Sequence, residues 1–189
     1  MNTGIKKIDL KNESLIIVAL SDCLDILDLI AKFKFGKGTN YFTESLFIRL
    51  KHLAYYFTKE SSPLIQYNCR LNADELIIID KIENIRHASA HLHADQHWLS
   101  DHLMISGAKN FKNQDVEIQY GPYTLFLIKD VLSIYKKFRE IFSQASELQR
   151  LSKHSNWGQQ EKDLKTIEKK LVSLLKNPVE LLKINNTNH

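Results

Sequence analysis

Apolar residues recur at helical spacing over the N-terminal part of the chain. A first helix is predicted over about 12–35, where the glycines of "FGKG" favour a stop. A second helix is predicted over about 41–59, because Pro63 prevents its simple continuation. The apolar positions that define these two helices are Leu15, Ile16, Ala19, Leu20, Cys23, Leu27, Ile30, Ala31, Leu46, Ile48, Leu50, Leu53, Tyr56 and Phe57.

A third helix is predicted from "NADE" (72–75) to about Leu92. The asparagine can cap the helix, and the acidic residues that follow suit its positive N-terminal end. The run "LIIID" (76–80) has the composition of a buried strand. Helix is favoured because one apolar face continues beyond that run, formed by Ile78, Ile82, Ile85, Ser89 and Leu92.

The second half of the chain contains a less regular segment and then two more helices. Residues 93–121 show no clear period, whereas 116–127 holds two alternating segments around a Gly-Pro pair, a pattern compatible with a short β-hairpin. Helical spacing returns over about 129–150 and about 159–176. The sequence therefore predicts an all-α fold, an antiparallel bundle of about five helices with a small hairpin near 116–127.

Composition agrees with a single ordered domain over residues 1–189. The chain is 43% hydrophobic and 25% charged with only six Gly and three Pro, which disfavours both disorder and an all-β fold. The net charge of +4 permits an anionic partner without establishing one. Cys23 and Cys69 form no CxxC pair, so we expect reduced thiols in a cytoplasmic protein. "LIIVAL" (15–20) is too short to span a bilayer, so no membrane association is expected.

Four of the eight histidines lie in one stretch, "ENIRHASAHLHADQH" (83–97). On a helical wheel, Glu83, His87 and His91 follow one another at i,i+4 steps on the side opposite the apolar face. Arg86 lies between the two faces. One interpretation is the solvated side of an amphipathic helix, although arginine and imidazoles then replace the usual lysine and glutamate.

A zinc site is a second interpretation of this stretch. His87 and His91 have the i,i+4 spacing that can hold one zinc ion. Ala88 occupies the glutamate position of HExxH, which excludes a metalloprotease of the usual form. Further ligands would have to come from Glu83, Asp95, His93, His97 and His102. The prediction adopted for this chain contains no metal and no cofactor.

The third interpretation is acid–base chemistry on RNA. "IRHASAH" (85–91) resembles the signature of HEPN domains (higher eukaryotes and prokaryotes nucleotide-binding), which is Arg, then Asn, Asp or His, three variable residues, and His. The likeness extends to a helical bundle of suitable length with the motif near the end of an internal helix. It implies a metal-independent endoribonuclease, often a toxin or an antiviral abortive-infection effector. In that family two copies of the motif face each other across a homodimer.

The residues of the motif suit this chemistry. A histidine with a pKa near 6.5 can accept the proton of a ribose 2′-OH or protonate the leaving 5′-oxygen, which we assign to His91. Arg86 would hold the scissile phosphate. His87 would orient His91 or contact phosphate, and Glu83 would support His87. Because the 2′-OH is the nucleophile, DNA would resist cleavage.

The resemblance implies RNA and a second copy of the chain as partners. It does not identify any other partner. In one toxin subgroup a tyrosine two residues after the histidine is modified by a nucleotidyltransferase antitoxin, and His93 stands there in this chain. That particular pairing is therefore not implied. A different cognate antitoxin or a partner from a defence system is the possibility that the resemblance leaves. The alternative function is a non-catalytic HEPN-like module that binds nucleotide, RNA or a partner protein.

Overall fold

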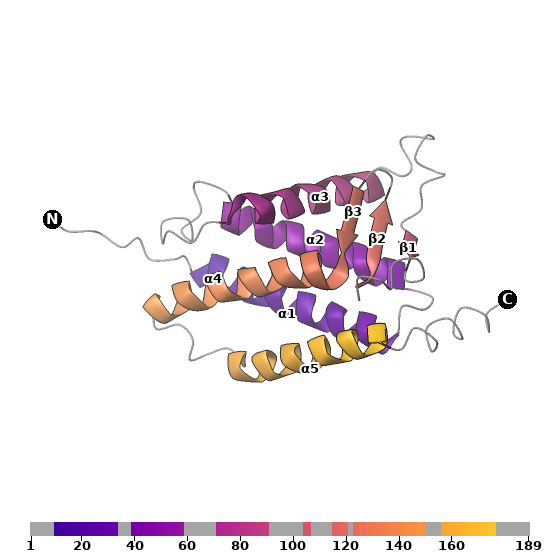
Figure 1. The fold of residues 1–189 in the computed structure, drawn as a ribbon. Helices are drawn as coiled ribbons and strands as arrows, with labels where there is room; N and C mark the ends of the chain where they lie inside the picture. Colours follow the sequence, from indigo (N-terminus) through magenta and orange to yellow (C-terminus); the bar gives the residue numbers. More distant parts are fainter. Residues whose placement is uncertain are drawn as a thin grey trace.

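The computed structural model describes residues 10–33, 39–58, 71–90, 104–106, 115–120, 123–149 and 156–176. Within these ranges the chain forms five α-helices and one three-stranded antiparallel sheet (Figure 1). The predicted all-α bundle with a small hairpin is confirmed. The helices are α1 (Leu10–Lys32), α2 (Thr39–Thr58), α3 (Ala73–Ala90), α4 (Ser133–Gln149) and α5 (Trp157–Lys176).

Helix α3 starts where the sequence predicted a cap. The Asn72 side-chain Oδ1 accepts a hydrogen bond from the Glu75 backbone N–H at 2.9 Å, and the Asn72 N–H donates to the Glu75 carboxylate at 2.7 Å. This reciprocal pair is a capping box, which satisfies two backbone donors that the first turn leaves without helical partners. The run "LIIID" is helical, as predicted, because its pattern continues into the buried Ile82 and Ile85.

Loss of this cap gives a simple stability test. Replacing Asn72 by alanine removes the side-chain acceptor and is expected to lower the free energy of unfolding by about 1 kcal/mol. Asn72→Ser keeps an acceptor at the same position and should stay within a few tenths of a kcal/mol of the wild type. Urea denaturation followed by circular dichroism measures both. Equal stability of the two variants would contradict the role of the cap.

The sheet lies at the end of the bundle where α3 ends (Figure 1). Strands β2 (Glu117–Tyr120) and β3 (Tyr123–Phe126) form the hairpin, with Glu117 opposite Phe126. Strand β1 (Met104–Ser106) pairs antiparallel with β2, so the order is β1-β2-β3. The sequence did not predict β1. Lys81 ties the sheet to α3 by donating a hydrogen bond to the Thr124 carbonyl at 3.3 Å.

A π-helical turn over Leu127–Leu132 connects β3 to α4, where the sequence predicted ordinary helix from about residue 129. The buried Asp115 carboxylate holds the start of this turn by accepting hydrogen bonds from the Ile128 and Lys129 N–H groups, each at 2.8 Å. It also accepts one from the Val116 N–H at 2.7 Å. The carboxylate thus gives partners to two N–H groups that the first turn leaves without helical acceptors.

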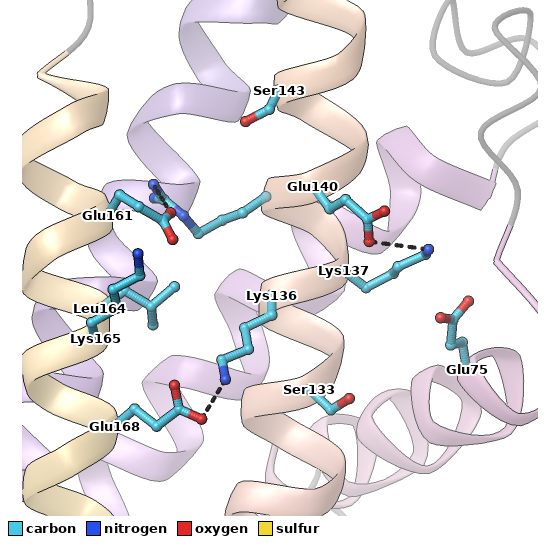
Figure 2. A pocket seen from close by; sticks show the side chains of 11 residues that line it. Glu75, Ser133, Lys136, Lys137, Glu140, Ser143, Glu161, Leu164, Lys165 and Glu168 are labelled. Atoms are coloured by element: carbon cyan, nitrogen blue, oxygen red, sulfur yellow. Dashed lines mark hydrogen bonds and ion pairs between the residues drawn. The ribbon is translucent and has the colours of Figure 1, made fainter.

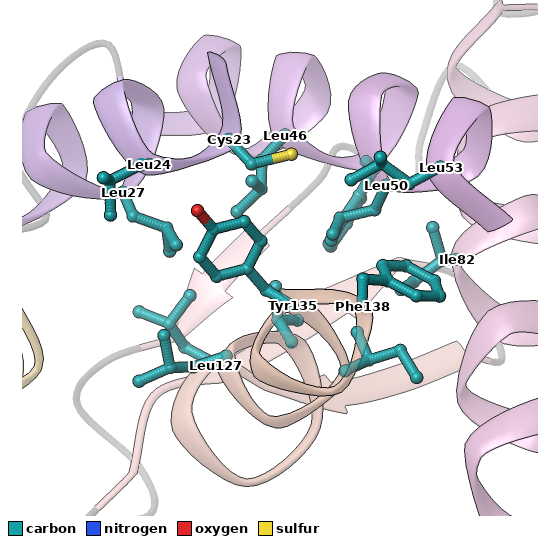
Figure 3. Packing of buried hydrophobic residues seen from close by; sticks show 14 of the residues in the cluster. Cys23, Leu24, Leu27, Leu46, Leu50, Leu53, Ile82, Leu127, Tyr135 and Phe138 are labelled. Atoms are coloured by element: carbon teal, nitrogen blue, oxygen red, sulfur yellow. The ribbon is translucent and has the colours of Figure 1, made fainter. Parts of the chain in front are cut away.

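The core lies between α4 and the layer formed by α1, α2 and α3 (Figure 3). Phe138 of α4 is fully buried and stacks on Phe57 of α2, with ring centroids 4.7 Å apart. The buried Tyr135 hydroxyl donates to the Leu20 carbonyl of α1 at 2.8 Å. Burial raises the pKa of Tyr135, so the hydroxyl stays protonated and remains a donor. Two aromatic side chains of α4 therefore attach this helix to α1 and to α2.

Helix α5 packs mainly along α1. Its inward positions are Leu164, Ile167, Leu171 and Leu175, all buried and spaced at three or four residues as the sequence predicted. Among the helices that the structure describes, none is long and apolar enough to cross a bilayer.

Candidate functional site on helix α3

Arg86 lies on the last two turns of α3, at the border between the buried and exposed sides. Ile82 and Ile85 on the same helix are fully buried, Arg86 is half-buried, and His87 is exposed. The Arg86 Nε is buried and has no hydrogen-bond partner among the residues that the structure describes. This placement agrees with the helical wheel, which put Arg86 between the two faces.

Glu83 contacts a residue that the sequence analysis did not single out. Its carboxylate forms an ion pair with the ammonium of Lys51 on the neighbouring helix α2. The prediction gave Glu83 the role of supporting His87, and the structure adds Lys51 as a partner of the same carboxylate. No local pattern indicates this contact, because it depends on how α2 is aligned against α3.

Lys51 brings a second cation to this edge of α3. Burial lowers the pKa of the Lys51 ammonium, and the nearby Arg86 guanidinium lowers it further. Two cations thus lie near each other at this edge of α3, and Glu83 pairs with one of them, Lys51. Holding two like charges close together and partly out of water has a free-energy cost. An anion bound beside Arg86 and Lys51 would lower that cost.

The structure describes part of the predicted catalytic set. Glu83, Arg86 and the exposed His87 lie near the C-terminal end of α3. His91 lies outside the described residues. So do Asp95 and the three further histidines considered as zinc ligands, His93, His97 and His102.

The described ranges offer no site for metal binding and no reactive thiol. No group of three or more His, Cys, Asp or Glu side chains there could hold a metal ion. Cys23 is a free, fully buried thiol whose pKa is raised by burial, so it remains protonated and unreactive. Cys69 lies outside the described residues.

Comparisons of the chain with protein-family models, with curated proteins and with solved structures found no match. The HEPN resemblance therefore depends on the motif in "IRHASAH" and on the helical fold around it.

Proposed function

We propose that the chain is a metal-independent endoribonuclease of the HEPN type that acts as a homodimer. The observation that carries the proposal is the position of Arg86. Its guanidinium stands at the end of an internal helix, beside a second cation, with a buried Nε that has no partner in the described part of the chain. A buried donor without a partner costs about 1–3 kcal/mol, and a role in binding the substrate phosphate would explain why the chain keeps one here.

The chemistry follows from the motif. His91 of one protomer accepts the 2′-OH proton, and the 2′-oxygen attacks the adjacent phosphorus. The bond from phosphorus to the 5′-oxygen breaks, and an imidazolium, His91 of the second protomer, protonates that oxygen. The products are a 2′,3′-cyclic phosphate and a 5′-hydroxyl. Arg86 and Lys51 stabilise the charge that develops on the phosphate oxygens.

Such an activity suits a toxin or an antiviral defence effector, because cleavage of cellular RNA stops growth. A cognate antitoxin or another defence component would then restrain it. The motif and the neighbouring cations Arg86 and Lys51 support RNA as the substrate. The cytoplasm is the compartment in which that substrate is found.

The test is cleavage of total RNA and tRNA by purified protein in EDTA. We expect cleavage by the wild type and at least a hundredfold loss for His91→Ala, because the proposed mechanism assigns both proton transfers to His91. His52→Ala is the matched control, since His52 is an exposed histidine on α2 outside the motif. DNA of the same sequence should remain intact.

Two results would contradict the proposal. Cleavage that survives His91→Ala would indicate a contaminant or another site. No cleavage by the wild type on either substrate would favour the non-catalytic binding module instead.

A further inference from the structure

A cavity of about 640 Å³ lies between α4 and α5, near the N-terminal end of α3 (Figure 2). Its volume is within the range of about 300–1,000 Å³ that is usual for small-molecule sites. The walls are mostly charged, and Leu164 is the apolar residue among them. A charged ligand would therefore find side chains of opposite charge to contact.

Arg139 is the buried charge of this cavity. Its side chain is only 3% exposed, and its guanidinium stacks on the Trp157 ring at 3.9 Å from the ring centre. Nη1 donates to Gln160 Oε1 at 3.0 Å and more weakly to the Tyr135 hydroxyl at 3.4 Å. Nε and Nη2 are buried without a hydrogen-bond partner among the described residues. The guanidinium therefore has donor capacity that this packing leaves unused.

The carboxylates around the cavity already have partners. Glu168 pairs with Lys136, Glu140 pairs with Lys137 at 3.2 Å, and Glu75 accepts the capping hydrogen bond from Asn72. Each of these three carboxylates thus has at least one partner, as the dashed lines in Figure 2 show for the first two pairs.

Glu161 is the exception because its contact with Arg139 is weak. Its carboxylate lies 3.5 Å from Arg139 Nη2, too far for a good hydrogen bond, and its side chain is 48% exposed. Lys165, one turn further along α5, lines the same cavity and has no ion-pair partner in the described ranges. The unused capacity of the cavity is therefore cationic, on Arg139 from one wall and Lys165 from the other.

We propose that this cavity binds a diphosphate group, with one phosphoryl oxygen displacing the Glu161 carboxylate from Arg139. A guanidinium with two free donors can grip phosphate in a bidentate manner, which the single distant carboxylate does not achieve. Lys165 meets the second phosphoryl group. The site is separate from the proposed nuclease site, because Glu75 at the N-terminal end of α3 lines it and Arg86 lies near the other end of that helix.

Calorimetry on the full chain in EDTA tests the proposal, with inorganic pyrophosphate and ADP as probes at matched ionic strength. We expect both to bind and Lys165→Gln to weaken both by roughly tenfold, as loss of one charge-assisted hydrogen bond would. Lys169→Gln is the matched control, since Lys169 is an exposed lysine one turn further along α5 that does not line the cavity. It should bind as the wild type does.

Glu161→Gln gives the sharper result. Removing the competing carboxylate should tighten pyrophosphate binding several-fold, whereas a carboxylate that only held α4 to α5 would produce no such gain. Because Arg139 is buried and its substitution can disturb folding, the exposed Glu161 and Lys165 carry the test.

Equal effects of Lys165→Gln and Lys169→Gln, or no binding of pyrophosphate by the wild type, would overturn the proposal. Equal affinities for the two probes would show recognition of the diphosphate alone, and tighter binding of ADP would add a contact with the nucleoside.

Discussion

Replacing Arg86 by alanine is expected to lower the rate of RNA cleavage by about two to three orders of magnitude. The guanidinium is the group that we assign to the scissile phosphate, and losing one such donor to a developing oxyanion typically has an effect of about this size. Arg86→Lys should recover only part of the rate, because an ammonium cannot hold two phosphate oxygens in a fixed plane. Single-turnover cleavage of tRNA measures both variants.

The control for this result is Arg49→Ala. Arg49 lies on α2 in an exposed ion pair with Asp22 at 3.0 Å, outside the predicted site. Its loss removes the same charge from the protein while leaving the motif intact, so cleavage should stay near the wild-type rate. The thermal transition shows whether Arg86→Ala folds. We expect it to fold, because the Arg86 Nε has no hydrogen-bond partner to lose in the described part of the chain. Equal rates for Arg86→Ala and the wild type would remove Arg86 from the mechanism.

Replacing Phe138 by alanine should have the largest effect on stability, a loss of about 3–5 kcal/mol in the free energy of unfolding. Phe138 is fully buried in the core (Figure 3). Its ring stacks on that of Phe57, which joins α4 to α2. Truncation removes apolar burial and leaves a cavity that neighbouring helices can fill only in part. Urea denaturation measures the loss directly.

Phe33→Ala is the comparison for a phenylalanine outside the core. Its side chain is 49% exposed at the end of α1, where it contacts Phe42 with ring centroids 5.2 Å apart. We expect a loss of about 1 kcal/mol or less. If Phe138→Ala were no more harmful than Phe33→Ala, the assigned packing of α4 on α2 would be wrong.

The helices were predictable because their signal is local. Ile82 and Ile85 continue one apolar face, and the Asn72–Glu75 cap marks its start, so α3 follows from residues close together in sequence. Helix α5 was predicted to begin near residue 159, with Trp157 outside it. Trp157 is instead the first residue of α5 and packs against Arg139 of α4, a contact that sequence spacing does not reveal.

The features that escaped prediction depend on contacts between distant segments. Strand β1 has only three residues, too few to show an alternating pattern, and exists because β2 pairs with it. The role of Asp115 likewise depends on Ile128 and Lys129 folding back to its carboxylate. At the candidate site, the helical wheel correctly placed Arg86 between the two faces of α3. The contact between Lys51 and Glu83 could not be predicted, because it depends on how α2 is aligned against α3.

The Tyr135–Leu20 hydrogen bond has a consequence for how the chain folds as it is synthesised. The two residues are 115 positions apart, so α1 has long left the ribosome when α4 emerges. Until then the inner faces of α1 and α2 lack the aromatic side chains that cover them, and the nascent chain carries apolar surface that must be kept from aggregating. Helix α3, with Arg86, therefore lies in a completed bundle only after α4 has been synthesised, and any activity of that helix would begin no earlier.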